Sequence, residues 1–339
     1  MIRVLVAEDS PTARALLVAI LGSDPEITVV GEACNGSEAV EMTRRLRPDV
    51  VTMDVRMPVL DGLEATKEIM ITAPTPIVIV TASFLARDVE ISLHALRAGA
   101  LTVLAKPPGP EAASFDEACR QLIAGVKAMS QVKVVRHWRP TTSVPIRHPP
   151  LVRGRGKLVA VAASTGGPAA LHRLLTDLPG DFPAPILVTQ HISPGFIAGL
   201  ADWLNRNSDL RVKLAEAGEP LAPHIVYLAP DDRHLGISEQ AIVLSTAPPI
   251  GGFRPSGTFL FESAARAYGA SVVVVILTGM GDDGVAGLRA VRAADGCVIA
   301  QDEQSCVVFG MPGAAVAAGA ADLVLPLDAI AARLRELVS

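Results

Sequence analysis

The sequence has few cysteines and few aromatic residues, and it lacks a long apolar run. Its four cysteines show no CxxC spacing, which excludes a disulfide scaffold and the usual zinc sites. The most apolar stretch, residues 271–277, is far shorter than the roughly 20 residues that a membrane-spanning helix needs. The chain also opens without a charged and then apolar leader. We therefore expect a cytoplasmic protein with no membrane insertion.

Charge is distributed unevenly along the chain, although the net charge is only −5. Residues 127–157 carry eight basic residues and no acidic one, and the regions on either side carry more acids than bases. This segment is also rich in proline and glycine. We predict a first domain over residues 1–125, a basic Pro-rich linker over 126–151 and a second domain over 152–339. A basic run alone is weak evidence for nucleic-acid binding, so no nucleic-acid partner is expected.

Aliphatic residues dominate, since half of the chain is apolar and only 4% is aromatic. Short, fully apolar runs separated by helical patterns are typical of parallel sheets buried under helices on both faces. In residues 1–125 the pattern predicts five β-α units and a five-stranded parallel sheet. The expected strands are Arg3–Ala7, Ile27–Ala33, Val50–Met53, Ile77–Val80 and Leu101–Ala105.

The same alternation returns after Leu158 and predicts a second, doubly wound and mostly parallel α/β sheet. A hairpin arm is a further possibility at Ile237–Leu244. The expected strands are Leu158–Ala163, Ile186–Gln190, Ile225–Ala229, Val272–Thr278 and Cys297–Gln301.

Polar residues follow the strands of the first predicted sheet. Glu8 and Asp9 follow the first strand, Asp54 the third, Thr81 the fourth and Lys106 the fifth. Strand ends of a parallel sheet meet at one edge, and three carboxylates gathered there would repel one another. A bound Mg²⁺ relieves that repulsion. Asp54 could then accept a phosphoryl group as a nucleophile, with the lysine and the hydroxyl neutralising the phosphoryl oxygens.

In the second half, Ser164 ends a strand and opens the string Ser-Thr-Gly-Gly-Pro before a helical pattern. Three readings stay open here: an ordinary helix start, an anion site at a helix N-terminus, or a nucleophilic serine. The string fits neither GxxxxGK[ST] nor GxGxxG nor GxSxG.

A nucleophilic serine needs a base and a group that orients the base. His191 and Asp283 also follow predicted strands of this sheet, so the three side chains are expected at one edge. Of the remaining histidines, His224 and His234 flank another strand and stay possible, whereas those within helices or in the linker are poorer candidates.

Taken together, these strings resemble two known families joined in one chain. Residues 1–125, with DVRMPVLDG at 54–62, resemble a two-component receiver domain, which has a flavodoxin-like fold. The rest resembles the chemotaxis protein-glutamate methylesterase, or CheB, family. That likeness lies in ASTGGP at 163–168, QHI at 190–192, GFRPS at 252–256 and LTGMGDDG at 277–284.

The resemblance implies the role of each candidate. In the receiver, Asp54 would be the phosphoacceptor, Glu8, Asp9 and Asp54 would bind Mg²⁺, and Thr81 and Lys106 would be switch residues. In the catalytic domain, which would need no cofactor, Ser164 would be the nucleophile, His191 the base and Asp283 its orienting partner. The Met280 backbone N–H would stabilise the oxyanion.

The implied activity is a phosphorylation-regulated ester hydrolase and glutaminase. It would hydrolyse glutamate γ-methyl esters, and deamidate glutamines, on methyl-accepting chemoreceptors, with a sensor histidine kinase as phosphodonor. A DNA-binding response regulator is less compatible with the long, acidic second half. A nucleotide-binding domain is also less compatible, because the Ser-Thr-Gly-Gly-Pro string lacks the lysine of a phosphate-binding loop. A catalytically inactive scaffold that only responds to phosphorylation stays open.

Overall fold

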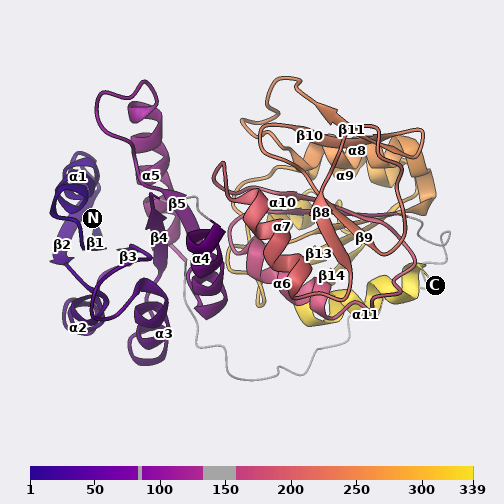
Figure 1. The fold of residues 1–339 in the computed structure, drawn as a ribbon. Coiled ribbons are helices and arrows are strands. Elements are labelled where there is room, and N and C mark those ends of the chain that lie inside the picture. The colour runs from indigo at the N-terminus through magenta and orange to yellow at the C-terminus, as the bar shows by residue number, and fades with distance from the viewer. Residues whose placement is uncertain (83–85, 133–157, 339) are drawn as a thin grey trace. The chain divides into compact units, whose positions relative to one another are not determined.

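Two large parallel sheets, one in each unit, organise the chain (Figure 1), which divides into the units Met1–Pro140 and Thr141–Ser339. The computed structural model describes residues 1–82, 86–132 and 158–338. Across these residues, no helix combines the length and the apolar character that a bilayer crossing requires. Most of the predicted linker at 126–151 lies outside the described residues.

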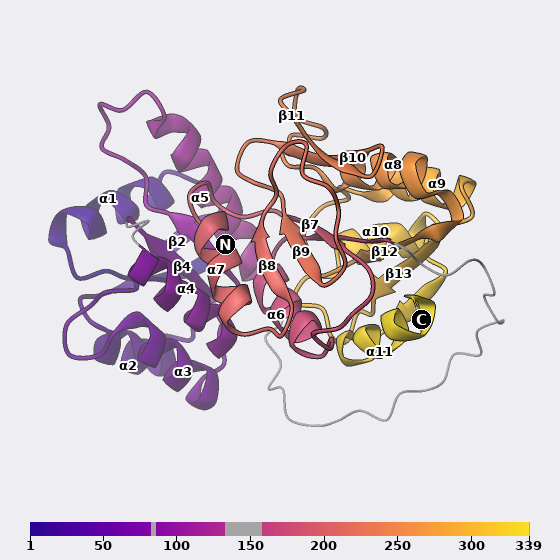
Figure 2. The ribbon, with the colours of Figure 1, turned by 45° about the vertical axis from the view of Figure 1, so that its right-hand side comes forward.

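The first unit holds the predicted five-stranded parallel sheet, in the order β2-β1-β3-β4-β5. Nearly every residue of β1, β3 and β4 is buried, because helices cover both faces (Figure 2). This confirms the expectation drawn from their continuous apolar character. The strands are β1 (Ile2–Ala7), β2 (Ile27–Ala33), β3 (Val50–Met53), β4 (Ile77–Thr81) and β5 (Thr102–Ala105).

Three helices of this unit, α1, α2 and α3, begin at residues whose side chains cap them. Ser10, Asn35 and Asp61 each accept a hydrogen bond from a backbone N–H in the first turn of the following helix, as N-cap residues do. The fifth helix runs past residue 125, the predicted end of the first domain. The helices are α1 (Pro11–Gly22), α2 (Gly36–Leu46), α3 (Gly62–Thr72), α4 (Ala86–Ala98) and α5 (Phe115–Ser130).

Val59 occupies a strained turn just after the DVRMP string. Its φ is 67°, and Leu60 N–H donates to the Pro58 carbonyl at 2.7 Å across it, which is the rare γ-turn that β-branched residues disfavour. The Val59 side chain is 87% exposed, so it contributes little packing.

We expect Val59→Gly to raise the free energy of unfolding of this unit by about 1 kcal/mol. Relief of about 1–3 kcal/mol of strain exceeds the added flexibility of glycine in the unfolded chain. Native-state hydrogen exchange of the β3 amides measures the change. Val59→Ile, which keeps the branched side chain, is the matched control; an equal gain there would rule out strain as the cause.

The second unit is built on a seven-stranded sheet in the order β14-β13-β12-β6-β7-β9-β8, and every pair in it is parallel. The doubly wound architecture is therefore confirmed. The strands are β6 (Leu158–Ala163), β7 (Ile186–Gln190), β8 (Arg211–Leu214), β9 (Ile225–Leu228), β12 (Val272–Ile276), β13 (Cys297–Gln301) and β14 (Leu323–Leu325). Two of these, β8 and β14, were not expected from the sequence.

The segment Ile237–Leu244 belongs to both arms of a hairpin rather than to one. Strands β10 (His234–Ser238) and β11 (Ala241–Ser245) pair in antiparallel fashion outside the large sheet. The turn between them places Glu239 and Gln240 at positive φ.

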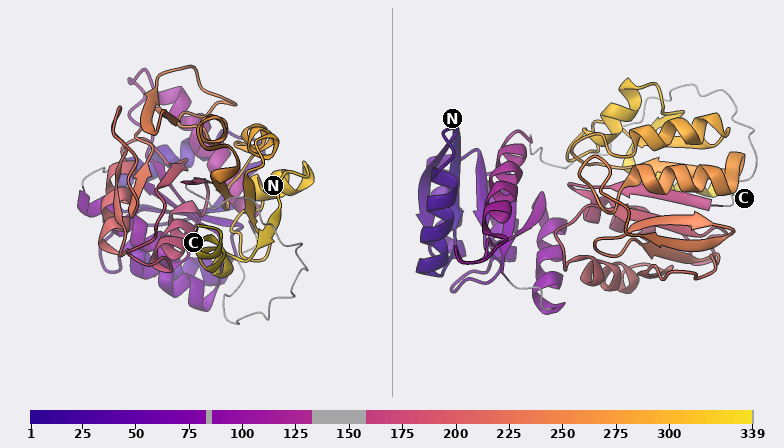
Figure 3. Two further views of the ribbon diagram at one scale, coloured as in Figure 1. Left: turned by 90° about the vertical axis from the view of Figure 1, so that its right-hand side faces the viewer. Right: turned by 90° about the horizontal axis from the view of Figure 1, so that it is seen from above.

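Helices cover both faces of the large sheet: in Figure 1, α8 and α9 lie above its strands and α6 and α11 below them, and the right-hand view in Figure 3 looks onto the side of α8 and α9. Helices α8, α9 and α10 pack on one side, and α6, α7 and α11 on the other. Residues of β6 and β12 alternate between the two sides, and all of them are buried. The helices are α6 (Gly167–Thr176), α7 (Ile197–Arg206), α8 (Gly257–Tyr268), η1 (Gly269–Ser271), α9 (Val285–Ala293), α10 (Met311–Ala317) and α11 (Leu327–Val338).

Candidate active site

Three neighbouring strands of the second sheet lead to the candidate catalytic residues: Ser164 and His191 directly follow β6 and β7, and Asp283 lies in the loop after β12. Strand β6 lies between β12 and β7. Beyond the regular ladder, Ser164 N–H donates to the Thr278 carbonyl at 3.0 Å, and His191 N–H donates to the Ala163 carbonyl at 2.9 Å. The sheet thus continues up to the serine and the histidine and fixes their backbones side by side.

The Ser164 turn is tight and leaves no room for larger residues. Gly166 has a φ of 77°, and Gly167 N–H donates to the Ser164 carbonyl at 2.8 Å. A Cβ on Gly167 would lie 2.0 Å from Gln190 Oε1. The same glutamine donates through Nε2 to the carbonyls of Ser164 at 2.8 Å and His191 at 2.7 Å. Gln190 therefore links the turn to the strand that carries the histidine.

His191 and Asp283 form a hydrogen-bonded pair. His191 Nε2 lies 2.9 Å from Asp283 Oδ2. The imidazole is stacked on Phe253, with ring centroids 4.2 Å apart and planes within 6°. In the described part of the chain, the buried Nδ1 atom has no hydrogen-bond partner. Because the carboxylate holds the proton on Nε2, Nδ1 is the nitrogen available to accept a proton.

Asp283 lies in a cradle of donors at the N-terminus of α8. Ser256 Oγ donates to Oδ1 at 2.7 Å, and Gly257 N–H donates to Oδ2 at 2.6 Å. Burial alone would raise the pKa of Asp283, but the hydrogen bond from His191, the charge of His191 and these two donors lower it from 3.8 to about 2. Asp283 is 6% exposed, whereas its neighbour Asp282 is exposed. Of the two, Asp283 is the partner of the histidine.

The low pKa of Asp283 makes stability depend on acid pH. Because the folded-state pKa lies below the unfolded value, the stabilisation is complete above about pH 4 and is lost as pH falls through about 2. The shift corresponds to about 2 kcal/mol. We expect the difference in unfolding free energy between wild type and Asp283→Asn to shrink by that amount between about pH 5 and pH 2. Urea unfolding at each pH measures it, and a constant difference would contradict the assignment.

The segment that presents Phe253 is anchored at two points. Ile250 and Phe253 exchange backbone hydrogen bonds at 3.1 and 3.0 Å across a two-glycine turn. Arg254 Nε donates to Asp232 Oδ1 at 2.7 Å. The segment that connects β11 to the start of α8 therefore supplies both the ring that stacks on the His191 imidazole and the donors that hydrogen-bond to the Asp283 carboxylate.

Met280 lies in an exposed loop after β12, and 46% of its surface is accessible. The Gly279 carbonyl accepts from the N–H groups of Gly310 at 3.0 Å and Met311 at 2.8 Å, and Gly279 N–H donates to the Val308 carbonyl at 3.0 Å. No hydrogen bond from the Met280 N–H is found within the described residues. It is thus free to donate to a ligand.

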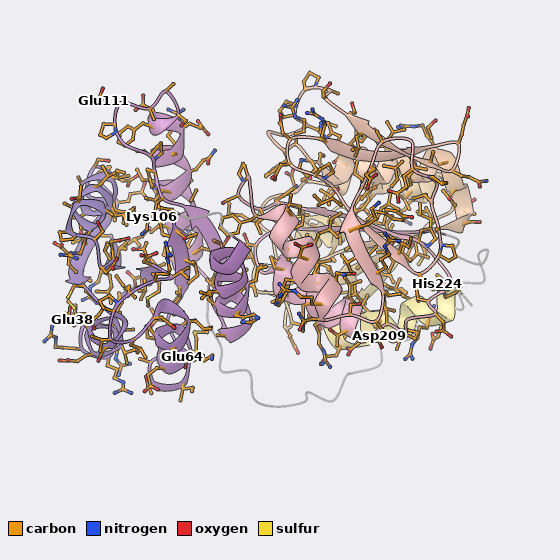
Figure 4. The ribbon with its side chains drawn as sticks, in the orientation of Figure 1. Glu38, Glu64, Lys106, Glu111, Asp209 and His224 are labelled. Atoms are coloured by element: carbon orange, nitrogen blue, oxygen red, sulfur yellow. The ribbon has the colours of Figure 1, made fainter. Side chains whose placement is uncertain are left out.

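The first sheet carries the second group of candidates. Lys106 Nζ lies 2.6 Å from Glu8 Oε2 and 2.9 Å from Asp54 Oδ2. Figure 4 shows this lysine at the end of β5 from which the chain leads past Glu111 into α5. Val55 N–H donates to Asp54 Oδ1 at 2.7 Å. Thr81 is buried at the end of β4, and its carbonyl accepts from Lys106 N–H at 2.8 Å.

Burial is the main cause of raised pKa values for Glu8 and Asp54, and repulsion by a neighbouring carboxylate adds to it. The pKa of Lys106 is raised as well: burial would lower it, but hydrogen bonds to the two carboxylates outweigh that effect. One lysine therefore does not fully relieve the crowding of acids at this edge.

Glu8, Asp9 and Asp54 fit a hard divalent cation. One carboxylate oxygen from each lies within 4.8 Å of the others. Oxygen ligands are those that Mg²⁺ prefers, and its charge would favour the ionised carboxylates. Asp9 also lines an open cavity of about 510 Å³ together with Val55 and Arg56, so this member of the cluster can be reached from solvent.

Several contacts of the His191–Asp283 pair could not be predicted from the sequence. The GFRPS string carries part of the family resemblance, but nothing in it assigns Phe253 to the imidazole or Ser256 to Asp283. His234, which the sequence left possible, stacks on Phe259 and has its Nε2 3.1 Å from the Pro248 carbonyl. It is fully buried in that separate position.

Comparisons with known proteins bear on both halves. A family model described as CheB methylesterase matches residues 159–334, and one described as response regulator receiver domain matches residues 4–113. The chain belongs to the CheB methylesterase family. Over 339 residues it is 56% identical to the protein-glutamate methylesterase/protein-glutamine glutaminase 4 of Myxococcus xanthus, covering 98% of this chain and 96% of that protein.

Two further relatives of this CheB-family chain support the same conclusion. The protein-glutamate methylesterase/protein-glutamine glutaminase 3 of Anaeromyxobacter dehalogenans is 55% identical to this chain over 338 residues, and the match covers 98% of both chains. The crystal structure of the Thermotoga maritima CheB methylesterase catalytic domain superimposes with a TM-score of 0.53 at 45% identity, covering 54% of this chain and 99% of that one. The family and the fold class predicted from the sequence are confirmed.

Proposed function

We propose that this chain is a phosphorylation-regulated ester hydrolase that removes methyl groups from glutamate γ-methyl esters, and deamidates glutamines, on methyl-accepting chemoreceptors. The observation that carries the proposal is the 2.9 Å hydrogen bond between His191 Nε2 and Asp283 Oδ2. Among the described residues, this bond leaves His191 Nδ1 without a partner. His191 directly follows β7, which pairs with β6, the strand directly before Ser164. An ionised carboxylate, an oriented imidazole and an adjacent serine are the parts that nucleophilic acyl transfer needs.

The first step forms an acyl-enzyme. His191 takes the Ser164 proton on Nδ1 as Oγ attacks the γ-carbonyl carbon of the ester. Asp283, whose pKa is about 2, stays ionised and stabilises the imidazolium. The Met280 N–H donates to the oxyanion, a contribution worth roughly 2.7–4 kcal/mol in comparable sites. The imidazolium then protonates the methoxy oxygen, the ester C–O bond breaks, and methanol leaves.

Water completes the reaction. His191 accepts a proton from the water molecule that attacks the acyl carbon, and returns it to Ser164 Oγ as the acyl bond breaks. The product is a free glutamate side chain on the receptor. With a glutamine substrate, ammonia leaves in place of methanol through the same steps.

The first sheet supplies the regulation in this proposal. Asp54 would accept a phosphoryl group from a sensor histidine kinase. Glu8, Asp9 and Asp54 would hold Mg²⁺, which when bound offsets negative charge on the phosphoryl oxygens. Lys106, now paired with Glu8 and Asp54, would re-pair with the phosphoryl group, and Thr81 would donate to it. The protein would work in the cytoplasm, where both the kinase and the receptor tips lie.

We expect Asp54→Asn to abolish the increase in methanol release that acetyl phosphate with Mg²⁺ causes in the full-length chain. The amide cannot be phosphorylated, so the two-state equilibrium of the receiver is not shifted. Asp61→Asn, which alters a helix cap and not the acceptor, should keep the response. A full response in Asp54→Asn would exclude this residue as the acceptor.

The activity itself is tested by methanol release from methylated receptor fragments incubated with the full-length chain. Mass spectrometry of the receptor peptides then identifies each methyl ester that has become an acid. The proposal expects release to depend on the chain and to occur at glutamate side chains. Unchanged receptor peptides, with and without acetyl phosphate, would contradict it.

A further inference from the structure

Thr278 contacts both halves of the candidate esterase site without belonging to the catalytic group. It follows β12, is 1% exposed, and stands between the Ser164 turn and the loop that carries Met280. Its carbonyl accepts from Ser164 N–H at 3.0 Å. Its hydroxyl lies 2.9 Å from the Thr165 carbonyl, directly after the nucleophile.

The same hydroxyl reaches a fourth segment of the chain. Val308 N–H donates to Thr278 Oγ1 at 3.0 Å, and Gly279 N–H donates back to the Val308 carbonyl at 3.0 Å. A hydroxyl has one proton and two acceptor positions. It can therefore donate to the Thr165 carbonyl and accept from the Val308 N–H at once, so that both partly buried backbone groups have a partner.

The backbone of Thr278 is held from the opposite side. Gln301 Oε1 accepts from Thr278 N–H at 2.8 Å, and Gln301 Nε2 donates to the Ser305 carbonyl at 2.7 Å. The segment from Gln301 to Val308 is thereby fixed against the end of β12. The methyl group of Thr278 lies next to Gly166, where an added Cβ would be 3.2 Å from it.

We propose that Thr278 is a positioning residue that keeps the Ser164 nucleophile turn in register with the Met280 loop through its side-chain hydroxyl. The inference rests on the proposed esterase function. Acyl transfer requires the serine Oγ and the oxyanion donor to be placed relative to the same carbonyl group, and small displacements are costly in rate. The Thr278 hydroxyl contacts the Ser164 turn at Thr165 and also contacts Val308, whose carbonyl accepts from Gly279 at the start of the Met280 loop.

Thr278→Val tests this because it keeps the shape of the side chain and removes only the hydroxyl. We expect kcat to fall by about 10- to 100-fold with KM nearly unchanged. Thr278→Ser, which keeps the hydroxyl, should restore most of the activity. Thr189→Val is the matched control, because Thr189 is also fully buried in this sheet but its hydroxyl has no partner within the described residues.

A second readout separates this inference from the proposed function. The rate constant for labelling of Ser164 by a fluorophosphonate, followed by intact mass, needs the serine, its base and the oxyanion donor but no receptor. It should fall in Thr278→Val by a factor similar to that of kcat, and the final extent of labelling gives the fraction of folded sites. A wild-type chain that is labelled yet releases no methanol would contradict the methylesterase proposal alone.

The inference on Thr278 fails on any of three results. Labelling of Thr278→Val at the wild-type rate would show that the hydroxyl is not needed. Equal losses in Thr278→Ser, which keeps the hydroxyl, and Thr278→Val, which lacks it, would show that the hydroxyl does not account for the effect. An equal loss in Thr189→Val would show that any buried threonine in this sheet has the same effect.

Discussion

Asp283→Asn is expected to lower kcat for methyl ester hydrolysis by about 10⁴-fold, the cost of the equivalent change in a well-studied triad. An amide offers one acceptor oxygen where Asp283 now receives donors from His191, Ser256 and Gly257. Its NH₂ group would face one of those donors. The imidazole would lose the partner that holds its proton on Nε2, and the imidazolium would lose its counter-charge.

The neighbouring residue provides the matched control for this prediction. Asp282→Asn makes the same chemical change one position earlier, on an exposed side chain. We expect kcat to change by less than about twofold, as is usual for surface substitutions away from a site. Methanol release by both variants decides the assignment. Similar losses in the two would show that the carboxylates share the role, and a larger loss in Asp282→Asn would reverse it.

Ser164→Ala is expected to have the larger effect, a fall in kcat of about 10⁶-fold. Without Oγ no acyl-enzyme can form, and only the oxyanion donor and substrate binding would still accelerate attack by water. KM should stay close to the wild-type value. Ser238→Ala, at an exposed serine on β10, is the control and should behave as wild type. Retention of substantial activity in Ser164→Ala would remove the serine mechanism.

The sequence was sufficient to predict the strands that carry the site. The bounds of β6, β7 and β13 were predicted to the residue, because continuous apolar runs between helical patterns are typical of buried parallel strands. Parallel strands place their carboxyl ends at one edge. The sequence therefore predicted Ser164, His191 and Asp283 at one edge, and the structure brings His191 and Asp283 into a hydrogen bond there.

The elements that were missed have weaker local signals. Strand β8, with the sequence RVKL, is an edge strand that alternates charged and apolar residues, and β14, at the other edge, has only three residues. Helix α10 contains Pro312 and Gly313 within its first turn, which reduces its helical propensity. Pairing with the neighbouring strand or packing on the sheet, rather than local sequence, stabilises these elements.

The surroundings of the His191–Asp283 pair could not be predicted for a different reason. Phe253 and Ser256 are more than 25 residues from Asp283 or His191 in the chain, and Thr278 and Val308 are 30 apart. Such contacts depend on how a long connecting segment folds back over the sheet. The hydrophobic periodicity of the sequence carries no information about that path. The orientation of His191, with Nε2 toward the carboxylate, likewise follows only from the folded geometry.

The most direct test of the central claim is the residual rate of the double variant Ser164→Ala/Asp283→Asn. If the serine, the histidine and the aspartate act as one group, the double variant should hydrolyse methyl esters no more slowly than Ser164→Ala alone, because Asp283 acts only through the attack by Oγ. Losses that multiply, so that the double variant falls about another 10⁴-fold below Ser164→Ala, would contradict the account.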